Sequence, residues 1–123
     1  MATSKSGKKA TSWIGGALIF SGRPDPTWSV AGRAARKLES LWAGLPPSVG
    51  KLPAAPALGY RGAFLRDGGG REWFTYGGTV TLTTRSAVQS RLDPARQFEK
   101  KLLATAPPAQ LPAEVSRVSR EGQ

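Results

Sequence analysis

The spacing of apolar and polar residues divides this chain into short stretches, each typical of one kind of element. The run from Trp13 to Phe20 is apolar and bounded by turn residues, which predicts a central strand. Between residues 31 and 45, alanine and leucine recur at three- and four-residue intervals, which predicts a helix with one apolar stripe. Ser29 stands where it would cap this helix, and Gly44 followed by two prolines ends it.

The second half of the chain predicts an antiparallel meander followed by another helix. Residues 59–66 alternate between two faces, and Asp67 with the three glycines after it forms a strong hairpin turn, because glycine tolerates positive φ. Residues 71–76 return as the partner strand, and residues 79–84 continue with apolar residues alternating with threonine. Asp93 followed by Pro94 predicts the start of the second helix.

Together these elements predict one α+β domain over residues 13–106. We expect a small antiparallel sheet of three or four strands with two helices packed on one face. Residues 1–12 are rich in serine, threonine, lysine and glycine, which predicts a disordered basic tail, and residues 107–123 follow as a flexible tail. A length of 123 residues suits a single domain.

A second interpretation of the N-terminal apolar run is a weak signal segment, because Lys8 and Lys9 precede it. The apolar run from Trp13 to Phe20 is only eight residues long, and no small-residue cleavage site ends it cleanly. No run in the chain approaches the ~18 apolar residues of a membrane span. We therefore expect a cytoplasmic protein with no membrane partner.

The chain contains neither cysteine nor histidine. Without cysteine there is no disulfide framework and no thiolate site, and without histidine the commonest general base and transition-metal ligand are missing. The glycines at 68–70 could be taken for a phosphate-binding loop, but no Lys-Ser/Thr and helix follow them, which favours a hairpin turn. We therefore expect a protein that is not an enzyme and that holds no cofactor and no metal.

The chain has a net charge of +10. Residues 13–105 carry thirteen basic and six acidic side chains, so the predicted domain alone has a charge of +7. A body this basic attracts polyanions over long distances. Arg33, Arg36 and Lys37 lie off the apolar stripe of the first predicted helix, where such a group is more often a solvated face than a binding face.

The segment Ser21–Trp28 predicts a stiff loop between the first strand and the first helix. Proline follows both Arg23 and Asp25, which biases the backbone of both residues toward extended or turn geometry. In the structural interpretation, Arg23 pairs with Asp25 while Trp28 closes the core beneath the helix. In the functional interpretation, the loop presents the Arg23 guanidinium to a carboxylate or phosphate.

Aromatic residues and arginines are interleaved on the two strands around the glycine turn. This arrangement is typical of surfaces that stack and neutralise single-stranded nucleic acid, although an aromatic face that packs on the helices gives the same pattern. Trp73 and Phe74 are adjacent, so one of them faces away from the core. The candidate binding residues are Arg23, Asp25, Trp28, Tyr60, Arg61, Arg66, Arg71, Trp73 and Tyr76.

Three motifs carry a resemblance to known proteins: Ser-Gly-Arg-Pro-Asp-Pro-Thr-Trp at 21–28, Leu-Gly-Tyr-Arg-Gly at 58–62 and Phe-Glu-Lys-Lys-Leu-Leu at 98–103. As a set they resemble a small uncharacterised family with a GRPxPxW loop and an LGYRG strand, over about residues 17–105. That resemblance implies a family but no activity. In size and layout the chain is also similar to small companion proteins of metalloenzymes that modify ribosomally made peptides, which implies an accessory role.

These observations predict a non-catalytic binding or accessory module. Its ligand would be an extended acidic peptide or partner protein, held by a strand edge and a basic aromatic surface. The alternative is a protein that binds single-stranded nucleic acid or another polyanion, driven by counterion release.

Overall fold

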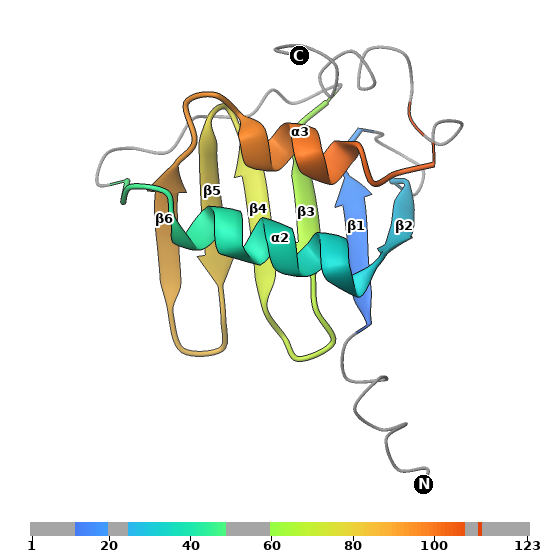
Figure 1. Ribbon diagram of the computed structural model, residues 1–123, viewed down its shortest axis with the longest axis horizontal. Coiled ribbons are helices and arrows are strands. Elements are labelled where there is room, and N and C mark those ends of the chain that lie inside the picture. The colour runs from blue at the N-terminus through green and yellow to red at the C-terminus, as the bar shows by residue number, and fades with distance from the viewer. Residues whose placement is uncertain (1–11, 20–24, 49–59, 108–110, 112–123) are drawn as a thin grey trace, which may run out of the picture.

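The computed structural model describes residues 12–19, 25–48, 60–107 and 111, which form an α+β fold. Its elements are β1 (Trp13–Ala17), β2 (Thr27–Val30), α2 (Gly32–Ala43), β3 (Ala63–Arg66), β4 (Glu72–Tyr76), β5 (Thr79–Thr83), β6 (Val88–Leu92) and α3 (Gln97–Leu103). The strands form one antiparallel sheet of six in the order β2-β1-β3-β4-β5-β6. Both helices cross the same face of this sheet (Figure 1).

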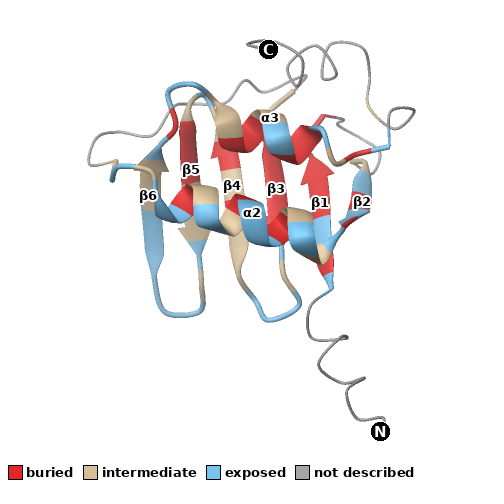
Figure 2. Ribbon diagram, in the orientation of Figure 1, coloured by how far each residue is buried: buried red, intermediate tan, exposed pale blue. Residues whose placement is uncertain are grey.

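The core lies between the sheet and the two helices, where buried residues gather on facing surfaces (Figure 2). On the sheet side, Trp13, Leu65 and Trp73 are buried on neighbouring strands, and Leu65 lies directly opposite Trp73. From the helices, Leu38 and Leu102 pack down onto them. Burying a leucine side chain contributes about 1.5–3 kcal/mol, so this layer supplies most of the stabilisation.

The strand β2 corrects the expectation that the proline loop leads directly into the first helix. Trp28 and Val30 are buried while Thr27 and Ser29 are exposed, a two-residue period that suits a strand, and β1 offers its free edge as a partner. The loop therefore joins β1 to β2. Ser29 lies in the strand and does not cap α2, whose N-cap is Ala31 without a side-chain hydrogen bond.

The strand β6 is the other reason why the expected count of three or four strands was too low. Its sequence alternates weakly, and both Val88 and Leu92 are exposed, so it carries little of the apolar signal that marks a buried strand. It forms an edge of the sheet, where burial is not required. The segment that follows α2 lies along its outer side, with Leu92 N–H donating to Pro46 C=O at 2.7 Å.

The second helix begins later than the Asp93–Pro94 signal predicts. Asp93 is buried and does cap the helix, accepting hydrogen bonds from the backbone N–H groups of Gln97 at 3.0 Å and Phe98 at 2.8 Å. The intervening Pro94 and Ala95 form a turn, and Arg96 has a left-handed backbone with φ of 55°. The aspartate is therefore a cap that reaches across a turn.

Several expectations fall partly or wholly outside the described residues. These are the two tails, Phe20 at the end of the first strand, and Arg23.

Candidate functional site

The predicted aromatic residues serve mainly the core and its lining. Trp73 is fully buried beneath the helices, and Trp28 is buried with its indole Nε1–H donating to Thr105 Oγ1 at 2.8 Å. Phe74 faces the opposite side of the sheet from Trp73, as their adjacency predicts. Neither tryptophan is available to stack on a ligand.

Tyr60 and Tyr76 come together at one end of the sheet, with ring centroids 6.3 Å apart. The Tyr60 hydroxyl donates to Glu99 Oε2, and Arg96 donates to the same fully buried carboxylate from Nε at 3.0 Å and Nη2 at 3.1 Å. Burial raises the pKa of Tyr60 far above its ordinary value, and the negative charge of Glu99 adds to this effect. This network fixes α3 to the segment just before β3 and engages the Tyr60 hydroxyl inside the fold.

Strict alternation predicts that Tyr60 and Phe64 share one face of the sheet. They do not, and Gly62 explains why. Its φ of 117° turns the chain just before β3, so Tyr60 packs against the core while Phe64 lies on the far side of the sheet. Arg61, between Tyr60 and Gly62, is half-buried.

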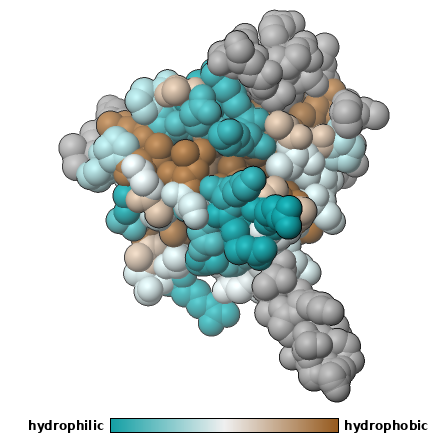
Figure 3. Space-filling model, in the orientation of Figure 1, coloured by the Kyte–Doolittle hydropathy of each residue, from teal (hydrophilic) through white to brown (hydrophobic). Residues whose placement is uncertain are grey.

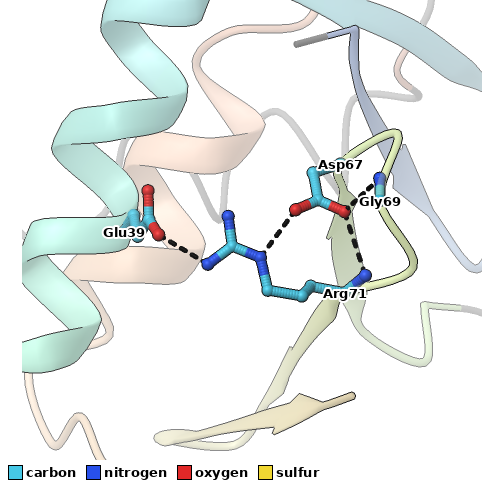
Figure 4. Close-up of polar contacts among 4 residues, drawn as sticks. All are labelled: Glu39, Asp67, Gly69 and Arg71. Atoms are coloured by element: carbon cyan, nitrogen blue, oxygen red, sulfur yellow. Dashed lines mark hydrogen bonds and ion pairs between the residues drawn. The ribbon is translucent and has the colours of Figure 1, made fainter. Parts of the chain in front are cut away.

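Arg71 is held on both sides by carboxylates (Figure 4). Its Nη1 donates to Glu39 Oε2 on α2 at 2.7 Å, and its Nε donates to Asp67 Oδ2 at 2.6 Å. Asp67 Oδ1 also accepts the backbone N–H of Gly69 at 2.8 Å, which closes the hairpin turn. Burial alone would raise the pKa of Asp67, but hydrogen bonds from Arg71 and Gly69 outweigh it and lower that pKa below its ordinary value. Arg71 therefore secures the turn to α2.

On the far face of the sheet, Arg66 is also paired. Its Nε lies 2.7 Å from Glu72 Oε1, and its guanidinium sits 4.1 Å from the centroid of the Phe64 ring. The far face thus offers aromatic and aliphatic groups but little net charge.

Asp25, from the proline loop, accepts the backbone N–H of Ile19 at 2.7 Å.

Each carboxylate in the described part of the chain is therefore held by an internal donor. Of the described cations outside these ion pairs, five lie on the helices. They are Arg33, Arg36 and Lys37 on α2 and Lys100 and Lys101 on α3, and we call this group the helical basic face. Arg85 lies apart from them in the β5–β6 turn, and Arg91 of β6 donates to the backbone carbonyls of Ala43 and Leu45.

A groove runs between the two helices on the helical basic face, with a volume of about 190 Å³. Ala34 and Leu38 of α2 give it an apolar wall, and Lys37, Lys101 and Thr105 also line it. Figure 3 shows the same pattern, with hydrophilic side chains over the helices and a hydrophobic band between them. The arrangement suits a ligand that carries both negative charge and apolar groups.

The positions of the α2 cations reduce the stability of the helix. Arg33 is in the first turn, where the helix dipole disfavours positive charge, and that turn holds no acidic residue. Arg33 and Lys37 are four residues apart, so their like charges are neighbours on the helix surface. The lysines of α3 lie in its last turn, where the dipole stabilises them. The α3 lysines thus have a structural reason for their position, whereas the α2 cations have none.

The structure therefore separates the two features that the sequence suggested would share one surface. The helical basic face lies over the helices, while the half-buried aromatic residue Phe74 faces the other side of the sheet. The sequence did single out Arg33, Arg36 and Lys37. The spacing of these residues alone could not show that the nearby carboxylate of Glu39 pairs with Arg71.

The described residues contain no group of three or more side chains that could hold a metal ion. In the same residues, no helix is long and apolar enough to cross a membrane. Comparisons of the chain with protein-family models, with curated proteins and with solved structures find no match in any of the three. The resemblance carried by the three sequence motifs therefore stays a prediction.

Proposed function

We propose that this protein is a non-catalytic binding module that holds an acidic segment of a partner protein on its helical basic face. The observation that carries the proposal is the gathering of Arg33, Arg36, Lys37, Lys100 and Lys101 on one layer without carboxylate partners in the described residues. A surface of one sign attracts a partner of the opposite sign and orients it during encounter.

The groove between α2 and α3 supports a peptide as the ligand. Its apolar wall at Ala34 and Leu38 gives a place for an aliphatic or aromatic side chain, and Lys37 and Lys101 give places for carboxylates. Apolar contacts at the centre with charged contacts at the rim are typical of protein interfaces. An accessory role beside a peptide-modifying enzyme fits this proposal and rests on the resemblance alone.

A second candidate ligand is nucleic acid, which the net charge of +10 and the arginines on α2 favour. Single strands are held largely by stacking on exposed aromatic rings. Trp28 of β2 and Trp42 of α2 are 5% and 6% exposed, so they cannot stack on bases. Nucleic acid would then be held by its phosphates alone, and its binding would fall steeply with salt.

The test uses fluorescence anisotropy with a labelled peptide of alternating threonine and glutamate, about ten residues long. We expect the double variant K37E/K101E to bind this peptide at least about tenfold more weakly than the natural protein. The control is R85E, a single charge reversal in the β5–β6 turn, away from the helices. It is compared with K37E, which reverses a single charge on the helical basic face. Equal losses in K37E and R85E would reduce the effect to net charge and overturn the proposal.

A parallel titration with single- and double-stranded DNA separates the two ligands. Micromolar DNA binding with a steep salt slope, together with weak peptide binding, would favour the nucleic-acid candidate. Turnover of a substrate by the purified protein alone would contradict a non-catalytic role.

A further inference from the structure

The two edges of the sheet differ in how they are covered. Along β6, the segment after α2 occupies the outer edge: Ser48 N–H donates to Ser90 C=O at 3.0 Å, and Pro47 forms a bridge opposite Arg91. Along β2, no described residue pairs with the outer edge. An uncovered strand edge is a template for another strand.

The register shows which groups of β2 point outward. Ala17 N–H donates to Pro26 C=O at 3.2 Å, so these two residues form a hydrogen-bonded pair. Such pairs alternate along an antiparallel ladder, which makes Trp28 and Val30 the residues of β2 that bond to β1. The N–H and C=O groups of Thr27 and Ser29 therefore point away from the sheet. Both residues are exposed, so the outward groups are open to a ligand.

We infer that an acidic extended segment of a partner protein adds to the sheet as a new strand along β2. This inference rests on the proposed function and specifies how the acidic segment is held. Main-chain hydrogen bonds to Thr27 and Ser29 would set its position, and alternate side chains would turn toward the helices.

The charges near β2 favour an acidic strand. The helix α2 begins two residues after β2 ends and crosses the sheet toward β6, so Arg33 and Arg36 lie in the turns of the helix nearest that edge (Figure 1). On the other side, Trp28 of β2 is hydrogen-bonded to Thr105, which also lines the groove between the helices. A new strand about 4.8 Å beyond β2 thus has its helix-facing side chains next to the helical basic face.

The same charges disfavour a second copy of this chain at the edge. Pairing of two β2 strands about a twofold axis would bring Arg33 and Arg36 of both copies near one interface, and like charges across an interface are repulsive. The edge is also short, at four residues, so main-chain pairing alone gives few hydrogen bonds. The carboxylates of the segment must supply the remaining affinity.

The experiment measures anisotropy of the labelled Thr-Glu peptide with S29P, and with V88P as the matched variant. Proline is tolerated on an edge strand when its missing N–H faces outward, so S29P removes one outward donor while leaving the ladder to β1 intact. Val88 starts the opposite edge strand and is 68% exposed. Circular dichroism and thermal melting check that both variants fold.

We expect S29P to weaken peptide binding about tenfold and V88P to change it less than about threefold. A second test does not depend on the folding of the variants. It uses two forms of the same peptide, each N-methylated on one of the two alternating sets of backbone nitrogens. One set of donors faces β2 and the other faces solvent, so only one of these peptides should lose binding.

Three outcomes separate this inference from the proposed function. Loss of binding in S29P and in one methylated peptide supports the strand addition. If K37E/K101E weakens binding while S29P and both methylated peptides bind normally, the helical basic face stands and the strand addition is overturned. If neither change affects binding, or the unmodified peptide does not bind, both are overturned.

Discussion

The Arg71 guanidinium donates to Glu39 Oε2 at 2.7 Å, which ties the β3–β4 hairpin to α2 across 32 positions of sequence. Both side chains are a little over one-third exposed, so the pair is screened by solvent. We expect a double-mutant cycle of R71A and E39A, measured by urea unfolding, to give a coupling free energy below about 1 kcal/mol. A coupling of several kcal/mol would contradict this description of the pair as a surface contact.

Asp67 makes the free energy of unfolding depend on pH in the acidic range. Its pKa is lowered in the folded state by the hydrogen bonds from Arg71 and Gly69, so its contribution is present above its ordinary pKa of 3.8. That contribution is lost as the pH falls through the lower folded value. We expect the unfolding free energy of the natural protein to decline more steeply below about pH 4 than that of D67N, measured by urea unfolding. Parallel curves would exclude this role.

Tyr60 makes the free energy of unfolding depend on pH in the alkaline range, where stability is lost as the pH rises. Because its folded pKa is raised, its contribution is complete below the ordinary value of 10.0 and declines as the pH rises above it. Y60F removes the titrating group and also one of the donors to the buried Glu99. At neutral pH we expect Y60F to lose about 1–3 kcal/mol of stability. Above pH 10 its stability should fall less steeply than that of the natural protein, and an identical fall would contradict the network.

Gly16 is required because the Phe64 ring lies directly on it. A Cβ at this position would lie 2.1 Å from the ring, so the ring or the strand would have to move. We expect G16A to destabilise the protein by about 1–3 kcal/mol in thermal or urea unfolding. G44A is the control, because its Cβ would meet its nearest atom at 3.7 Å. Equal losses in the two variants would exclude the ring contact as the cause.

The sequence predicted the elements that contribute to the core, because a buried face imposes a period. The stripe of α2 and the glycine turn after Asp67 were both predicted correctly. The edge strands β2 and β6 were missed because edges carry weaker apolar patterns, and in β2 a serine before an apolar helix imitates a cap.

The candidate site was harder to predict than the fold. Whether an arginine is free depends on where the carboxylates lie, and Arg71 meets Glu39 only because the hairpin folds back on α2. Periodicity contains no information about such pairs. It placed Arg33 and Lys37 outside the core correctly, but a solvated face and a binding face have the same pattern.

The most direct test of the central claim is an NMR titration of the labelled protein with the Thr-Glu peptide, followed through backbone amide shifts. We predict that the largest shifts fall on Ala34–Leu38 of α2, on Lys101–Thr105 at and just after the end of α3, and on Thr27–Ser29 of the β2 edge. Shifts confined to the far face of the sheet, around Thr81 and Val88, would contradict it.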